Sequence, residues 1–160
     1  DDNGKTWKIG GIVGPQCNEC QIVERTDGTL LLNIRSYRGM NRRLVAESKD
    51  GGETFSEPRE DFALIEPVCE ASLVRHLGKE GGILFSNPAS KKREKMTVRL
   101  SRDDGKTWPH AKELNVGASA YSCLAVLHDG TVCCLYERGE KNAYETLTLA
   151  RFSLGWLTAK

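Results

Sequence analysis

The sequence lacks any long apolar run and any surplus of charge of one sign. Its uninterrupted apolar stretches extend over only a few residues, whereas a membrane-spanning helix needs about 20. Of 160 residues, 23 are Lys or Arg and 22 are Asp or Glu, which gives a formal net charge of +1. The basic surplus that general attraction to nucleic acid requires is therefore absent. With 39% hydrophobic residues, the composition predicts a folded domain with no membrane span and no nucleic-acid partner.

Six cysteines are present, but they do not follow the spacing of a metal site. Cys17 and Cys20 form one CxxC pair, and no second pair of Cys or His follows at zinc spacing. Cys133 and Cys134 are adjacent in an expected strand, so their side chains should point to opposite faces. We predict free or buried thiols, with no metal and no cofactor.

Short apolar or alternating runs recur between turn residues, which is typical of β-strands. Asp27-Gly28 and Asp129-Gly130 predict tight hairpins, because both residue types tolerate the positive φ of a primed turn. No segment of helical length shows a convincing 3.6-residue apolar stripe. The chain is therefore predicted to be all-β. The expected strands are 21–25, 30–35, 44–48, 71–77, 83–86, 97–101, 123–128, 132–137 and 146–152.

One eight-residue pattern, S-x-D-x-G-x-T-[WF], occurs twice in full and once without its leading Ser, about every 50 residues. That period is in the range of propeller blades. The Asp side chain can accept backbone N–H groups of its own turn, Gly supplies a positive φ, and the aromatic residue anchors the turn. We interpret these positions as structural and not as ligand contacts; they are Asp2, Ser48, Asp50, Gly52, Thr54, Phe55, Ser101, Asp103, Gly105, Thr107 and Trp108.

These repeats resemble the Asp boxes of sialidases (neuraminidases) and related BNR-repeat proteins. The resemblance implies a six-bladed β-propeller of four-stranded antiparallel blades, of which this chain would supply roughly the last half. Residues 17–60 would form one blade, 69–116 the next, and 120–153 three strands of a last blade. The fourth strand, and the N-terminal blades that the ring needs, would lie upstream. An open half-ring would expose apolar faces and unpaired edges.

Three further stretches resemble, in order and spacing, the parts of bacterial and lysosomal-type sialidases that carry the active site. They are 18–21 with 33–35 (NECQ, NIR), 85–88 with 96–101 (FSNP, MTVRLS), and 121–124 with 135–139 (YSCL, LYERG). The resemblance implies Tyr121 as the nucleophile and Glu19 as its base. It also implies that Arg35 and Arg99 bind the substrate carboxylate, and that Glu137 supports another arginine of the triad.

The chemistry of sialic acid suits these residue types. Its carboxylate on the anomeric carbon matches the planar fork of a guanidinium group. A carboxylate nucleophile would be repelled by that group, whereas a neutral phenol is not, and sialidases with a tyrosine nucleophile are a known exception among glycosidases. A phenol with a pKa near 10 needs a neighbouring base.

The implied function is an exo-α-sialidase: retaining hydrolysis of terminal sialic acids from sialylated glycoconjugates. Two alternatives stay open, a non-catalytic BNR-propeller module that binds glycans and a hydrolase of a related sugar acid. The family's first arginine and its aspartate general acid have no counterpart here, so the chain alone is expected to be inactive. The compartment is unknown from the sequence, although the resemblance favours a secreted, periplasmic or lysosome-like location.

Overall fold

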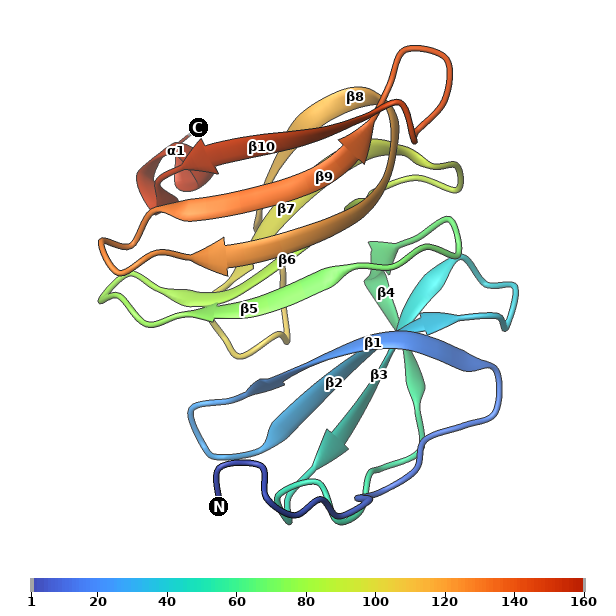
Figure 1. Ribbon diagram of the computed structural model, residues 1–160, viewed down its shortest axis with the longest axis vertical. Coiled ribbons are helices and arrows are strands. Elements are labelled where there is room, and N and C mark those ends of the chain that lie inside the picture. The colour runs from blue at the N-terminus through green and yellow to red at the C-terminus, as the bar shows by residue number, and fades with distance from the viewer. Residues whose placement is uncertain (1, 160) are drawn as a thin grey trace.

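The computed structural model describes residues 2–159, and the predicted all-β class is confirmed. Within that range the chain forms ten strands and one short helix (Figure 1). Their bounds are β1 (Cys17–Glu24), β2 (Leu30–Ser36), β3 (Arg42–Ser48), β4 (Arg59–Ile65), β5 (Ser72–His76), β6 (Gly82–Pro88), β7 (Glu94–Ser101), β8 (His110–Val126), β9 (Val132–Arg138), β10 (Thr146–Phe152) and α1 (Leu154–Thr158).

The first four strands form one antiparallel sheet in the order β1-β2-β3-β4. The other six form a second sheet in the order β10-β9-β8-β7-β6-β5. Every neighbour in these sheets is antiparallel and is also a neighbour in the sequence. The assignment of these strands to successive blades stays a prediction.

Strand β8 belongs to two parts of the second sheet. Its first half pairs with β7 as far as Ala118, and its second half pairs with β9 from Ser119 onward. Figure 1 shows β8 curving between these two partners. Tyr121 lies just after this bend.

Apolar side chains from both sheets form a shared core. Val23, Leu31 and Val45 of the first sheet pack in one cluster with Leu73 and Phe85 of the second. Figure 1 shows β1 and β5 facing each other across this contact, and Arg75 Nε donates to the Glu24 carbonyl at 2.7 Å. The two sheets are therefore one packed unit.

The two predicted hairpins are present, but their turns are not of the primed type. Gly28 and Gly130 have φ of 83° and 82°, whereas the aspartates before them keep negative φ. Each aspartate instead accepts a backbone N–H two residues later, from Thr29 and Thr131, both at 2.9 Å. The hairpin prediction is confirmed, although only the glycine of each pair adopts positive φ.

The two complete Asp boxes form the expected turns, after β3 and after β7. In the second box, Asp103 accepts the Thr107 N–H at 2.8 Å, the Thr107 hydroxyl at 2.6 Å and the Ser101 hydroxyl at 2.7 Å. Asp50 accepts the same three groups of the first box. Trp108 packs on Phe85 with ring centroids 5.6 Å apart.

The incomplete third copy forms the turn without burying its aromatic residue. Asp2 accepts the Lys5 N–H at 2.9 Å and the Thr6 hydroxyl at 2.6 Å. Trp7, in contrast, is 91% exposed. The hydrogen bonds of the box therefore form independently of the packing of its aromatic residue.

Three elements were not expected from the sequence: β4, the first half of β8, and α1. β4 begins with three charged residues, of which Arg59 is exposed, and ends with four apolar ones, so its sequence shows no apolar alternation. The helix has only five residues, too few for a periodic stripe; Ser153 caps it by accepting the Trp156 N–H at 3.2 Å, and Leu157 is buried.

Candidate active site

Tyr121, Glu19 and Arg35 meet where the two sheets adjoin. The Tyr121 hydroxyl donates a hydrogen bond to Oε1 of Glu19 at 2.5 Å. Nη1 of Arg35 donates to Oε2 of the same carboxylate at 2.5 Å and lies 3.1 Å from the Tyr121 hydroxyl oxygen. The three side chains come from β8, β1 and β2, so the contact joins residues that are distant in the sequence.

The network determines where the shared protons lie. Partial burial acts to raise the pKa of Glu19, but hydrogen bonds from Tyr121 and Arg35 outweigh it and hold that pKa below its ordinary value. The hydrogen bond to Glu19, followed by partial burial, raises the pKa of the Tyr121 phenol. The cluster therefore holds an ionised carboxylate in contact with a neutral phenol.

Arg93 is a fourth member of the cluster, and the sequence pattern did not reveal it. Its guanidinium carbon lies 5.7 Å from the centre of the Tyr121 ring, and its charge helps to lower the pKa of Glu19. Nη1 donates to the Tyr144 hydroxyl at 2.6 Å, and Nη2 donates to the Val68 carbonyl at 3.4 Å. Two arginines, Arg35 and Arg93, thus flank the ring of Tyr121.

Arg99, which was expected in this cluster, lies on β7 and makes a different contact. Nη1 donates to Oδ1 of Asn87 at 3.2 Å. Burial lowers its pKa, and the charge that opposes this shift is Asp61. Arg93 lies six positions earlier, in the turn before β7. Within residues 2–159, Arg99 has no hydrogen bond to Glu19, Arg35 or Tyr121, so the structure brings Arg93, and not Arg99, to the cluster.

Two further carboxylates hold the backbone at Tyr121. Oε2 of Glu137 accepts the Tyr121 N–H at 3.0 Å. Oε2 of Glu70 accepts the next N–H along the chain, that of Ser122, at 3.2 Å. Glu70 was not singled out from the sequence, because it precedes a strand in a stretch with no catalytic pattern.

A buried ion pair fixes the loop after β4. Nη1 of Arg43 lies 2.7 Å from Oε2 of Glu66, with 0% and 1% of the two side chains exposed. Oε1 of Glu66 accepts the Ser36 N–H at 2.9 Å, at the end of β2. Val68 in this loop has φ of 55°, an unusual conformation for a β-branched residue. Because the Val68 carbonyl accepts from Arg93, the loop helps to position that arginine.

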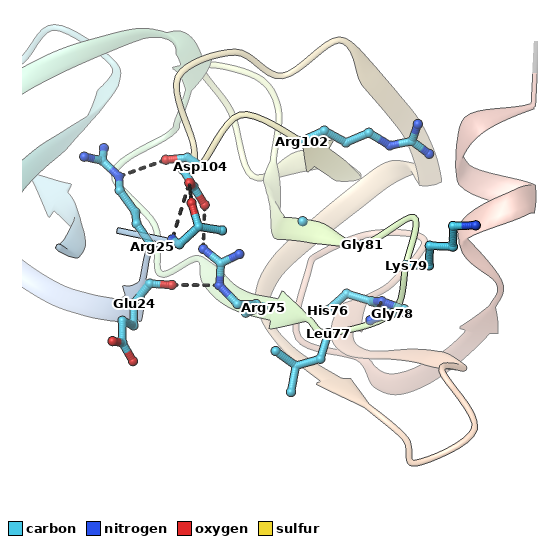
Figure 2. Close-up of a pocket in the computed structure, with 12 residues that line it drawn as sticks. Glu24, Arg25, Arg75, His76, Leu77, Gly78, Lys79, Gly81, Arg102 and Asp104 are labelled. Carbon is cyan, nitrogen blue, oxygen red and sulfur yellow. Dashed lines mark hydrogen bonds and ion pairs between the residues drawn. The ribbon is translucent and has the colours of Figure 1, made fainter. Parts of the chain in front are cut away.

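A depression at the opposite ends of the strands, beside the second Asp box, is occupied by structural contacts (Figure 2). Oδ1 of Asp104 accepts from Nη2 of Arg75 at 2.7 Å, and the Asp104 carbonyl accepts from Nε of Arg25 at 2.9 Å. These bonds attach the β1–β2 turn to β5 and to the box. We therefore interpret the residues that line this depression as structural contacts that join the two sheets.

Other chemistry is not apparent in the part of the chain that the structure describes. Among residues 2–159, no three His, Cys, Asp or Glu side chains are grouped so that they could hold a metal ion. All six cysteines are free thiols; burial raises the pKa of Cys69 to about 11 and that of Cys134 to about 12. In the same range, no helix has the length and apolarity to cross a membrane.

Comparison with known proteins identifies the family. A family model described as a BNR repeat-like domain matches residues 1–134. The chain belongs to the BNR repeat-like domain family. It is 39% identical to a sialidase of Micromonospora viridifaciens over 98% of this chain and 25% of that protein. It is 38% identical to a sialidase of Bacteroides fragilis over 85% of this chain and 27% of that protein.

Solved structures agree with these sequence relatives. The Hadza microbial sialidase Hz136 superimposes with a TM-score of 0.86 and 34% identity, over 98% of this chain and 31% of that one. A leech intramolecular trans-sialidase complexed with 2,7-anhydro-Neu5Ac gives a TM-score of 0.82 and 25% identity, over 98% and 27%. The fold is therefore part of a sialidase-type β-propeller, and the chain spans about a quarter of the length of these curated relatives.

Proposed function

We propose that this chain carries part of the active site of a retaining exo-α-sialidase, which hydrolyses terminal sialic acids from glycoconjugates through a tyrosine nucleophile. The observation that carries the proposal is the 2.5 Å hydrogen bond from the Tyr121 hydroxyl to Glu19, with Arg35 and Arg93 beside it. The sialidase names of the relatives support the same class of substrate. The complex of the leech enzyme was prepared by soaking with 3′-sialyllactose. Because 3′-sialyllactose is a sialoside, this complex supports the same class of substrate.

Glu19 makes Tyr121 competent as a nucleophile. The phenol is neutral at rest, because its hydrogen bond to Glu19 raises its pKa. As the Tyr121 oxygen bonds to the anomeric carbon, its proton passes to the Glu19 carboxylate and the glycosidic C–O bond breaks. The leaving oxygen takes its proton from a general acid, which we assign to the part of the propeller outside this chain. Water then attacks the anomeric carbon of the tyrosyl intermediate and gives a proton to the deprotonated general acid, while the Tyr121 oxygen leaves and takes its proton back from Glu19; two inversions give net retention.

Arg35 and Arg93 are the proposed ligands of the substrate carboxylate. Arg35 lies on β2, with its Nη1 3.1 Å from the Tyr121 hydroxyl oxygen, and Arg93, in the turn before β7, lies over the face of the Tyr121 ring. A guanidinium pair placed next to the nucleophile would hold the carboxylate beside the carbon that Tyr121 attacks. Arg99 has no part in this proposal because it is bonded to Asn87.

Glu137 retains a supporting role in the proposal. One of its oxygens accepts the Tyr121 N–H, which leaves the other available to an arginine from the upstream blades. A charge-assisted pair of that kind would connect the carboxylate-binding arginines to the strand of the nucleophile.

Trapping of the covalent intermediate tests the proposal. The full-length protein should be incubated with a fluorinated sialosyl fluoride, which forms the glycosyl-enzyme quickly and releases it slowly. We expect a mass increase of one fluorosialosyl group on the peptide that contains Tyr121, and none in Tyr121→Phe. Label on another residue, or turnover with inverted product, would contradict the mechanism. Binding of a sialoside without turnover would indicate the glycan-binding module, and turnover of only another sugar acid would indicate the third alternative.

A further inference from the structure

The second half of β8 has an open edge beside the nucleophile. β7 covers that edge only as far as Ala118, after which β9 on the other side is the one strand paired with β8 in the described sheets. In an antiparallel strand, alternate N–H groups point to the same edge. The N–H groups of Ser122 and Leu124 thus share an edge, and with β7 gone they need other acceptors.

The side chains of Glu70, just before β5, and of Ser72, its first residue, supply those acceptors. The Ser122 N–H donates to the Glu70 carboxylate at 3.2 Å, and the Leu124 N–H donates to the Ser72 hydroxyl at 2.9 Å. Glu70 and Ser72 are alternate residues and therefore face the same side of an extended segment. β5 is thus attached to β8 through side chains in place of a backbone ladder.

The same stretch of β8 contains an irregularity at Tyr121. The pairing with β9 shifts between Ser119 and Ser122, as in a β-bulge. The Tyr121 N–H there donates to the Glu137 carboxylate at 3.0 Å. Two successive amides, one on each side of the Tyr121 Cα atom, are consequently held by two carboxylates, one from β9 and one from the segment before β5. Bulges next to active sites often redirect a side chain.

We propose that Glu70 is a positioning residue for Tyr121: by accepting the Ser122 N–H at the open edge of β8, it fixes the bulge that directs the phenol toward Glu19. This inference rests on the proposed function of Tyr121. Glu70 acts through the backbone, because its hydrogen bond is to Ser122 and the phenol is bonded to Glu19 and Arg35.

The surroundings of Glu70 argue against a direct role for its charge. Burial raises its pKa most; the Ser122 N–H and the charge of Arg43 oppose that shift, the carboxylates of Glu19 and Glu137 add to it, and the net direction is upward. Glu70 is thus a third carboxyl group beside Glu19 and Glu137, and burial makes its ionised form energetically unfavourable. An amide oxygen could accept the same N–H without that cost, so substitution by glutamine separates hydrogen-bond acceptance from charge.

Three variants of the full-length protein test the inference with an aryl sialoside. Glu70→Ala should lower kcat by about 10- to 100-fold with KM within about threefold, because a small misplacement of a reacting group costs on this order. Glu70→Gln should restore most of kcat. Ser72→Ala is the matched control: it removes the acceptor of the Leu124 N–H on the same edge, and should lower the melting temperature but leave kcat nearly unchanged.

The outcomes separate this inference from the proposed function. Normal kcat in Glu70→Ala, or a loss in Glu70→Gln equal to that in Glu70→Ala, would overturn the positioning role even if Tyr121→Phe is inactive. Near-normal turnover by Tyr121→Phe would instead overturn the proposed function. If the wild-type protein turns over no sialoside, hydrogen exchange of the Tyr121 and Ser122 amides decides: Glu70→Ala should accelerate it and Glu70→Gln should not. Unchanged exchange in Glu70→Ala would overturn the inference.

Discussion

Tyr121 and Glu19 are 102 positions apart in the chain, and their side chains share a hydrogen bond of 2.5 Å. The bond joins β8 to β1, which belong to different sheets. It also lowers the pKa of the carboxyl and raises that of the phenol. Substitutions in this pair, and in the residues that hold it, should therefore have distinct effects on turnover, substrate binding and stability.

Tyr121→Phe should reduce kcat toward an aryl sialoside by on the order of 10³-fold or more, because the attacking oxygen is lost. The matched control is Tyr136→Phe, whose hydroxyl lies 3.5 Å from the Leu114 carbonyl and outside the Glu19 network. That control should keep near-normal turnover, and circular dichroism should show both variants folded. Comparable activity in the two variants would count against Tyr121 as the nucleophile.

Glu19→Gln should lower kcat by about 10²- to 10⁴-fold, the usual contribution of a general base. Because the pKa of Glu19 is held below its ordinary value of 4.5, the wild-type kcat/KM should persist below that pH and fall only as the pH drops through the lowered pKa. Glu24→Gln, an exposed substitution near the other end of β1, serves as the control. An unchanged rate for Glu19→Gln near neutral pH would exclude the base role.

Arg93→Met and Arg99→Met should have different effects: the first on KM and the second on stability. Removing Arg93 should raise KM by at least about tenfold, because a charge-assisted bond contributes roughly 1.5–3 kcal/mol, and Arg93→Lys should recover little because an ammonium cannot copy the fork. Removing Arg99 should leave KM within about threefold and mainly lower the melting temperature. Steady-state kinetics and thermal unfolding of both variants measure this, and a KM effect confined to Arg99 would restore the assignment made from the sequence.

Asp103→Asn should destabilise the protein in a pH-dependent manner. Slight burial acts to raise the pKa of Asp103, but the hydrogen bonds of Thr107 and Ser101 lower it to about 2, against an ordinary value of 3.8. A carboxylate with a depressed folded-state pKa stabilises the fold fully above the unfolded value and loses this contribution as the pH falls through the folded value. The melting temperatures of wild type and variant should differ at pH 7 and converge between about pH 4 and 2.

Lys106→Gln is the control for that experiment, since Lys106 is exposed in the same turn and has no role in the Asp103 bonds. Its melting temperature should follow that of the wild type at every pH. A difference between Asp103→Asn and wild type that is as large at pH 2 as at pH 7 would show that the box stabilises the turn without its charge.

Much of the fold could be predicted because its determinants are local. An Asp box is complete within eight residues, so Ser101, Asp103 and Thr107 could be matched to their turn without knowledge of distant contacts. The Asp-Gly hairpins are local in the same way. β4 was missed because its half-exposed position leaves no clear apolar alternation.

The site was only partly predictable because it is assembled from separate strands. Arg93 follows Lys91 and Lys92 in a polar stretch that has the composition of a solvated loop. The pairing of β7 with β8 is irregular at Met96, between Arg93 and Arg99. Only the extension of β7 back to Glu94 places Arg93 at the same end as Tyr121. Glu70 acts on a backbone amide, and no side-chain pattern in the sequence reports such a contact.

The bend in β8 has a consequence for the order of folding. Each sheet is a meander of neighbouring strands, so most of its pairing closes short loops and forms early. The Tyr121–Glu19 bond requires the bend, both sheets and a closure over 102 residues, and it should therefore be among the last contacts to form. During refolding from denaturant, recovery of catalytic turnover should lag behind recovery of the β-sheet signal in circular dichroism.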